Sequence, residues 1–194
     1  MVYNGRIAAA YLSQLFKIDP DRTKGEESVM PIIDQHTLDF ISHSADQTRR
    51  MGARLSQLFT GGEVLFLTGD LGTGKTCLVQ GIGQGLGIKE RITSPTFTLV
   101  NEYPGKRLTL YHVDLYRIVD VKATMTFGLD EYLYGDGICA IEWAERAKSI
   151  WTEEYLFISL RYIDEMKRGI ALRGVGQQYD QLVTRFKLEA FGVH

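Results

Sequence analysis

The sequence predicts an α/β protein whose sheet contains both parallel and antiparallel strands. Short apolar runs alternate with stretches of helical periodicity. The apolar run Ile138–Ile141 is typical of a buried parallel strand, and the β-rich runs on either side of Pro104-Gly105-Lys106 are typical of an antiparallel hairpin. With 194 residues and a hydrophobic content of 44%, the chain is long enough to bury one sizeable core.

Composition argues against several classes of protein. The formal net charge of -2 does not indicate a strongly basic surface for nucleic acid. Cys77 and Cys139 have no cysteine or histidine at ligand spacing, which argues against a zinc site and a disulfide scaffold. No apolar run reaches the roughly 18 residues needed to cross a bilayer. We therefore expect a cytoplasmic protein without a membrane helix.

Residues 1–35 differ in pattern from the rest of the chain. A short apolar stretch is followed by the polar, charged run DPDRTKGEES, which is typical of a flexible extension. Because Met30 precedes a new ordered pattern, the upstream segment could instead be a translation-start artefact. We expect an extension over residues 1–35 and a single domain over residues 36–194.

The first half of the domain is predicted as two pairs of a strand and a helix. A short strand over residues 38–42 precedes a helix for which Ser44 offers the N-cap. The apolar face of this helix consists of Met51, Leu55, Leu58 and Phe59. Gly61-Gly62 ends the helix, Val64–Thr68 reads as a buried strand, and a second helix is expected from Lys75 to about Leu86.

The second helix contains a glycine at every second position: Gly81, Gly83 and Gly85. Each interior glycine costs roughly 0.5–1 kcal/mol relative to alanine, so a compensating interaction is expected. Close packing against a neighbouring element is favoured over a second phosphate loop, because no strand precedes these glycines.

The second half is predicted to complete the sheet. Residues 97–103 and 107–113 form the hairpin, and residues 117–136 are mostly helical or irregular. The remaining strands are expected over residues 138–141, 155–160 and 169–173, and a closing helix over residues 178–186.

The stretch GDLGTGKT, residues 69–76, carries the strongest functional signal. Its spacing G-x-x-x-x-G-K-[ST], between an apolar strand and a helix, is typical of a loop that wraps phosphates with its backbone N–H groups. Gly69, Gly72 and Gly74 allow positive φ and close backbone approach. Lys75 is expected to reach the β- and γ-phosphate oxygens, and the Thr76 hydroxyl to ligate magnesium.

Two acids compete to complete the magnesium site. Glu142 ends the apolar run 138–141 and would emerge from a central parallel strand, where ligands bind in such sheets. Asp114 follows a run of mixed polarity that suits a half-exposed antiparallel strand. We therefore assign Glu142 to the metal and Asp114 to the γ-phosphate or the attacking water; the alternative for each is a surface acid that caps a strand.

Other candidate residues allow two interpretations. The hydroxyls of Thr93-Ser94-Pro95-Thr96 could sense a γ-phosphate as a switch loop does, or form a plain turn. His112 has no partner at ligand spacing, so a core histidine is favoured over a metal ligand. Trp143 and Tyr116 follow the two acids and could stack on a base or a partner, or simply pack at strand ends.

Taken together, GDLGTGKT, TSPTFTLVNEY, YHVDLYR and AIEWAE resemble, in this order and spacing, the motifs of the bacterial TsaE (YjeE) family. The resemblance runs from about Leu38 to Leu172. This family is the ATPase component of tRNA threonylcarbamoyladenosine biosynthesis. Its fold is a P-loop NTPase-like mixed β-sheet with helices on both faces, and its partners are the TsaD and TsaB proteins, which handle the tRNA.

The resemblance also implies roles for individual residues. The phosphates of ATP would be contacted by Gly72, Thr73, Gly74, Lys75, Thr76 and Cys77. Magnesium would lie on Thr76 and Glu142, and Asp114 would serve the hydrolytic step. Further nucleotide contacts would come from Ser44, Glu145 and Arg168. Thr73 and Cys77 replace the alanine and threonine often found in the family, and neither change removes a needed donor.

The sequence therefore predicts a magnesium-dependent ATPase that is slow alone and activated by partners. A small-molecule kinase shares the phosphate loop but would need an arginine-rich lid, for which only residues 161–173 are a candidate. A third alternative is a nucleotide-binding module with negligible turnover.

Overall fold

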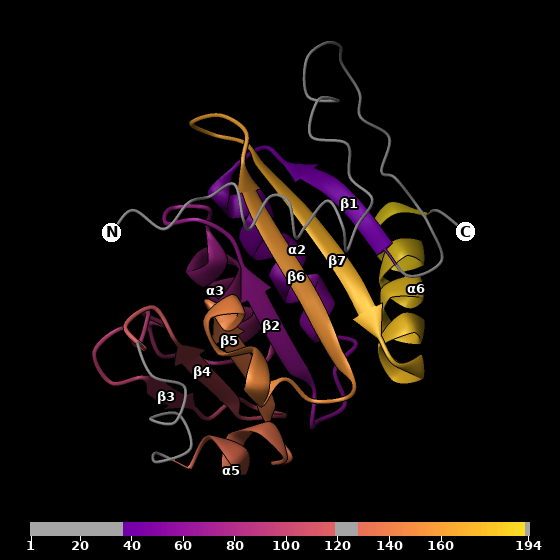
Figure 1. Ribbon diagram of the computed structural model, residues 1–194. Helices are drawn as coiled ribbons and strands as arrows, with labels where there is room; N and C mark the ends of the chain where they lie inside the picture. The colour runs from indigo at the N-terminus through magenta and orange to yellow at the C-terminus, as the bar shows by residue number, and fades with distance from the viewer. Residues whose placement is uncertain (1–36, 119–127, 193–194) are drawn as a thin grey trace.

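The computed structural model describes residues 37–118 and 128–192 (Figure 1). The predicted extension over residues 1–35 lies outside the described residues, as do residues 119–127 of the segment 117–136, so the predictions made for them are not tested. The described end of that segment contains a short helix, residues 129–133, as predicted. The remaining chain forms a single mixed sheet with helices packed on it.

The sheet has seven strands in the order β1-β7-β6-β2-β5-β4-β3 within the described chain. The strands are β1 (Thr37–Ser42), β2 (Val64–Thr68), β3 (Val100–Tyr103), β4 (Leu110–Asp114), β5 (Ile138–Glu142), β6 (Tyr155–Tyr162) and β7 (Arg168–Val175). Strands β6, β2, β5 and β4 run parallel, whereas β1, β7 and β3 add antiparallel pairs at the two edges. The sheet is therefore mixed, as predicted.

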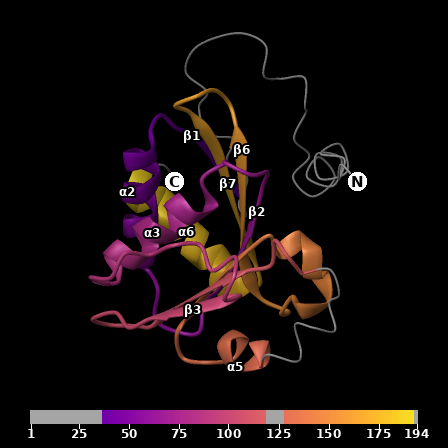
Figure 2. The same ribbon diagram turned by 90° about the vertical axis from the view of Figure 1, so that its left-hand side faces the viewer.

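Helices cover both faces of the sheet (Figure 2). They are α2 (Ala45–Ser56), α3 (Lys75–Gly85), α5 (Leu129–Leu133), the 3-10 helix η1 (Ala144–Ile150) and α6 (Gln177–Phe191). One buried core joins the sheet to α2, α3 and α6, and a second core joins the other face to α5 and η1. None of the helices in the described part has the length and apolarity to cross a membrane.

The first helix begins as predicted but ends earlier. Ser44 is the N-cap of α2, because its hydroxyl oxygen accepts a hydrogen bond from the backbone N–H of Gln47 at 3.1 Å. The helix stops at Ser56, and Leu58 and Phe59 lie beyond it but are still buried in the core. Apolar periodicity identified the buried residues correctly and placed the helix end too late.

The alternating glycines of α3 are positions of close packing, as predicted. A Cβ on Gly81 would lie 2.1 Å from the carbonyl oxygen of Arg49, and one on Gly85 would lie 2.5 Å from that of Ala53. Both contacts are with the backbone of α2, which could not move aside without shifting the helix. The two helices therefore approach each other more closely than any larger residue would allow.

One prediction about β4 is wrong. This strand forms the expected antiparallel hairpin with β3, but it also pairs in parallel with β5 along its full length. It is thus not a half-exposed strand, and Asp114 at its end is only 2% exposed. The mixed polarity of residues 108–113 had suggested a half-exposed antiparallel strand, because a local pattern does not reveal a second pairing partner.

Candidate functional site

The candidate site lies where the parallel strands end. In β4 and β5, Asp114 is directly opposite Glu142, so their two carboxylates emerge side by side at the same edge of the sheet. The loop that follows β2 and the first turn of α3 face them across a pocket of about 430 Å³. The lining includes Gly72, Gly74, Lys75, Thr76, Asp114 and Glu142.

The glycine loop has the backbone conformation that its sequence predicted. Gly69, Gly72 and Gly74 have φ values of 134°, 80° and 97°, which side-chain-bearing residues rarely adopt. A Cβ on Gly69 would also lie 2.2 Å from the carbonyl oxygen of Leu160, whereas a Cβ on Gly72 would meet no atom within 4 Å. Gly72 is thus required for its conformation alone, and it leaves open space on the pocket side of the loop.

Lys75 is held against the loop from which α3 begins. It is 4% exposed, and its Nζ donates to the carbonyl oxygens of Gly69 at 2.6 Å and Asp70 at 3.0 Å. The ammonium also lies 3.7 Å from the centroid of the Trp143 ring. Burial lowers the pKa of Lys75, while the nearby carboxylates, Glu142 foremost, oppose that shift.

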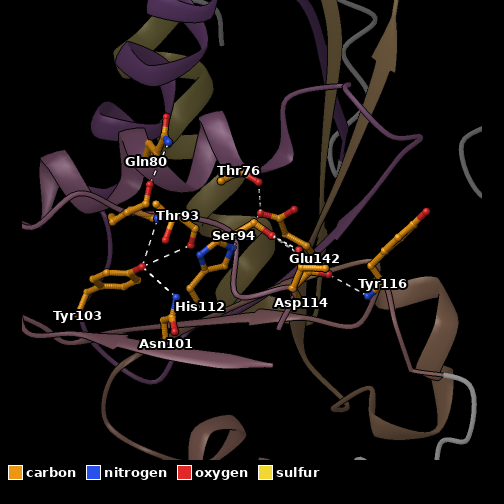
Figure 3. Close-up of polar contacts among 12 residues, drawn as sticks. Thr76, Gln80, Thr93, Ser94, Asn101, Tyr103, His112, Asp114, Tyr116 and Glu142 are labelled. Carbon is orange, nitrogen blue, oxygen red and sulfur yellow. Dashed lines mark hydrogen bonds and ion pairs between the residues drawn. The ribbon is translucent and has the colours of Figure 1, made fainter. Parts of the chain in front are cut away.

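Thr76 and Glu142 form a direct pair across the pocket. The Thr76 hydroxyl donates to Oε1 of Glu142 at 2.7 Å, so its oxygen lone pairs remain free to face a cation. Glu142 is 3% exposed and also receives a 2.8 Å contact from Nε2 of His112 (Figure 3).

The hydroxyl of Thr76 and the carboxylate of Glu142 are oxygen ligands, and they fit magnesium rather than a soft metal. Magnesium prefers oxygen ligands, and it is commonly held by one or two protein oxygens together with phosphate oxygens and water. The described residues contain no group of three His, Cys, Asp or Glu side chains that could hold a metal ion without such help. The hydroxyl and the carboxylate side by side therefore suit a magnesium ion that arrives with a phosphate.

Asp114 is surrounded by hydrogen-bond donors. Its Oδ2 accepts from the hydroxyls of Ser94, at 2.5 Å, and Thr96, at 2.8 Å. Its Oδ1 accepts from the backbone N–H of Tyr116 at 2.8 Å. The hydroxyl loop thus contacts the site through Asp114 (Figure 3), and its role as a switch loop stays a prediction.

The same loop contains a strained residue next to these contacts. Leu99 has a φ of 66°, which is rare for a residue with a branched side chain. Its N–H bonds to the carbonyl oxygen of Pro95 at 2.7 Å, and its own carbonyl oxygen accepts from the N–H of Asp114 at 3.0 Å. The backbone of the loop is therefore tied directly to the strand that carries the acid.

The remaining predicted contacts do not line the pocket. Ser44 is engaged as the cap of α2. The thiol of Cys77 donates to the carbonyl oxygen of Ala45, the first residue of α2, at 3.3 Å. Arg168 bonds to backbone carbonyl oxygens of the turn between β6 and β7, among them that of Asp164 at 2.6 Å.

Glu145 and Thr73 complete the set of predicted residues. Burial raises the pKa of Glu145, whose Oε2 is buried without a hydrogen-bond partner in the described chain. Thr73 is buried within the glycine loop, where its hydroxyl donates to the carbonyl oxygen of Asp70 at 2.8 Å. Thr73 therefore shapes the loop from inside.

The sequence did not predict the contacts that His112 and Trp143 make with residues of the site. His112 was expected to be a core histidine, and it is fully buried, but it also contacts Glu142. The available signal was period-two alternation, which puts residues 112 and 114 on one face of their strand. Trp143 packs against Tyr116 with ring centroids 4.9 Å apart and also faces Lys75, which only the folded chain reveals.

The fold and the site together define the class of this protein: an α/β protein with a P-loop-like fold, in which a glycine loop joins a buried strand to a helix. The model of the family described as "Threonylcarbamoyl adenosine biosynthesis protein TsaE" matches residues 42–170. The chain belongs to the TsaE family.

Known relatives agree with this assignment. The chain is 46% identical over 132 residues to the Treponema pallidum tRNA threonylcarbamoyladenosine biosynthesis protein TsaE, covering 68% of this chain and 97% of the relative. It is 38% identical over 137 residues to the Bacillus subtilis protein of the same name, covering 71% and 85%. The crystal structure of Bacillus subtilis YdiB is similar, with a TM-score of 0.68 and 33% identity over 84% of this chain and 99% of that one.

Proposed function

We propose that this protein is the ATP-binding and ATP-hydrolysing component of tRNA threonylcarbamoyladenosine biosynthesis, acting in the cytoplasm on a transferase complex of TsaD and TsaB. The observation that carries the proposal is the Thr76–Glu142 hydrogen bond of 2.7 Å beside the glycine loop, in a chain of the TsaE family. The tRNA would be handled by the partners, in keeping with the formal net charge of -2.

The glycine loop and Lys75 would bind the phosphates of ATP. Backbone N–H groups of the loop and of the first turn of α3 would point at the phosphates, and the open space beside Gly72 gives a phosphate room to approach the backbone. Lys75 would exchange its bonds to the carbonyl oxygens of Gly69 and Asp70 for bonds to phosphate oxygens, through rotation of its flexible side chain.

Thr76 and Glu142 would hold Mg²⁺. When bound, this ion supplies charge neutralisation on the phosphate oxygens. The Thr76 hydroxyl would keep its hydrogen bond to Glu142 and direct its oxygen lone pairs to the ion, so that one hydrogen bond orients both ligands.

Asp114 would orient the water that attacks the terminal phosphate. Its Oδ2 already accepts from the hydroxyls of Ser94 and Thr96, whereas Oδ1 accepts only from the N–H of Tyr116 and could also accept a hydrogen bond from a water. A partner that moved the hydroxyl loop would change the hydrogen bonds of this carboxylate, in keeping with an ATPase that is slow alone and that a partner activates.

The kinase alternative is not favoured. The only candidate for its arginine-rich lid, residues 161–173, consists of the paired ends of β6 and β7 and their turn. Arg161 in this region is bound to Asp39 of the edge strand β1 at 2.8 Å. A nucleotide-binding module without turnover has the same site, and only a rate measurement separates it from the proposed ATPase.

The test is ATP turnover by the purified protein, alone and after addition of TsaD and TsaB. We expect strong stimulation by the pair and its loss in Lys75→Ala, with exposed Lys89→Ala as the matched control that keeps wild-type turnover. Turnover that stays unchanged on addition of the pair would contradict the proposal and would promote a screen of small-molecule phosphate acceptors. Full activity of Lys75→Ala would remove the phosphate-loop assignment itself.

A further inference from the structure

His112 lies in the interior of the sheet, behind the pocket. It is the third residue of β4 and is 0% exposed. Its Nε2 lies 2.8 Å from Oε1 of Glu142, the oxygen that also accepts from the Thr76 hydroxyl. Figure 3 shows the imidazole between the hydroxyl loop and Glu142.

The strand register explains this contact. His112 is opposite Ala140 and Asp114 is opposite Glu142, in a parallel pair of strands. Since alternate residues of a strand share a face, His112, Asp114 and Glu142 lie on the same face, and the imidazole reaches diagonally to the next residue pair. Two hydrogen-bonded central strands therefore fix the distance between the imidazole and the carboxylate.

The contact with Glu142 involves one ring nitrogen of His112, Nε2. A carboxylate only accepts hydrogen bonds, so a positioning role for His112 requires the tautomer in which Nε2 carries the proton and donates a hydrogen bond to Glu142. The other ring nitrogen, Nδ1, is buried without a hydrogen-bond partner in the described part of the chain. Among the described residues, Glu142 is therefore the hydrogen-bond partner that orients the imidazole.

We propose that His112 is a positioning residue for the magnesium site, which holds Oε1 of Glu142 in the orientation that meets Thr76. This inference rests on the proposed function, because it concerns the same site. Glu142 has two donors on Oε1, and only one of them, Thr76, would itself contact the ion. Without His112, the carboxylate would depend for its orientation on a hydroxyl that the ion also uses.

The effect is expected in the dependence on magnesium. Loss of a hydrogen-bond partner behind a metal ligand typically lowers metal affinity or activity by about 10- to 100-fold. His112→Leu removes the donor and keeps an apolar side chain of similar size, whereas His112→Gln keeps an N–H donor on a side chain of similar length. We expect the first variant to need about 10- to 100-fold more Mg²⁺, and the second to recover most of this loss.

Binding is measured by calorimetry with a non-hydrolysable ATP analogue, titrated at increasing Mg²⁺ and also with EDTA. With EDTA, the wild type and both variants are expected to bind the analogue equally, since His112 acts only through Glu142. The matched control is Tyr179→Phe, which removes another buried hydrogen bond, to the N–H of Val64 at the start of β2, far along the strand from the pocket. It should lower the melting temperature without changing the magnesium dependence.

A second measurement needs no variant. Nitrogen NMR of the histidine ring in the ligand-free wild-type protein reports which nitrogen carries the proton. We expect a protonated Nε2 for His112, assigned by its loss in His112→Gln. An unprotonated Nε2 would overturn the inference, because the imidazole could then not donate to Glu142.

The outcomes separate this inference from the proposed function. If Mg²⁺ does not tighten binding of the analogue to the wild type, the proposed function fails and this inference fails with it. If Mg²⁺ tightens binding equally in the wild type and in His112→Leu, only the positioning role is wrong. Should His112→Leu not fold, an unprotonated Nε2 in the NMR measurement would still overturn the inference.

Discussion

Each of the two buried carboxylates at the site has its own hydrogen-bond donors. Glu142 receives the hydroxyl of Thr76 and Nε2 of His112, and Asp114 receives two hydroxyls of the loop and one backbone N–H. The two acids thus have separate hydrogen-bond partners, although they sit opposite each other in one parallel pair of strands. Their expected roles differ for the same reason.

Substitution of the two acids should therefore produce different defects. Glu142→Ala removes the carboxylate beside Thr76, so we expect about a tenfold or larger rise in the Mg²⁺ needed for nucleotide binding. Asp114→Ala should leave binding largely intact and slow partner-stimulated hydrolysis by about 100-fold or more, the usual range for a lost acid–base group. Calorimetry and turnover on the same preparations measure both effects, and the reverse pattern would show that the two roles were assigned the wrong way round.

Contacts between elements position the loop that carries these residues. The helix α3 starts directly at the glycine loop and packs against α2 with almost no space between the two backbones. The alternating glycines of α3 lower its intrinsic helix propensity, and the close packing offsets that cost. The position of Lys75 and Thr76 therefore depends on how tightly these two helices fit.

Gly81→Ala should disturb this fit. Alanine favours the helix by about 1 kcal/mol, but its Cβ would lie 2.1 Å from the carbonyl oxygen of Arg49, so we expect a net loss of stability of about 1–3 kcal/mol. Gly83→Ala should be milder, because its Cβ would meet side-chain carbons of Ile92 and Ile88 and no backbone atom, and the nearest of them is the terminal carbon of Ile92. Urea unfolding measures both, with exposed Gln84→Ala as the control in the same helix. Equal stabilities of the three variants would contradict tight backbone packing.

At the scale of the whole molecule, the last helix is joined to the centre of the sheet. The N–H of Val64, at the start of β2, donates to the hydroxyl oxygen of Tyr179 in α6 at 2.8 Å. These residues are far apart in the sequence, and the bond connects the closing helix to a central strand. Burial raises the pKa of Tyr179 to about 12.

This contact predicts a sensitivity to alkaline pH. A tyrosine has a pKa of about 10 in an unfolded chain, so the folded protein resists its ionisation, and the stability that this provides below about pH 10 is lost as the pH rises toward about 12. Tyr179→Phe leaves a buried N–H unpaired and should cost about 1–3 kcal/mol at neutral pH.

The alkaline loss is measured by urea unfolding at neutral pH and at steps between about pH 10 and 12. We expect a smaller further loss in Tyr179→Phe than in the wild type, and the wild-type response in the control Tyr134→Phe, whose side chain is exposed. A parallel decline in all three proteins would show that Tyr179 does not contribute to the alkaline sensitivity.

Much of the fold could be predicted because it is encoded by local patterns. The glycine loop, the strand before it and the helix after it occupy consecutive residues, and each depends on the conformational preferences of its own side chains. The family could be recognised for the same reason, since its motifs are short and contiguous. The division into residues 1–35 and 36–194 stays a prediction, because the first segment lies outside the described residues.

The sequence by itself determined the motifs that identify the family and their order along the chain, and it predicted which residues would carry phosphate chemistry. Only the tertiary structure decided that β4 runs beside β5, so that Asp114 is buried and His112 reaches Glu142. The reason is that a strand's own side chains do not specify which strand lies beside it. Pairing depends on burying surface from segments distant in the sequence, and the contacts that orient the site arise only when those segments meet.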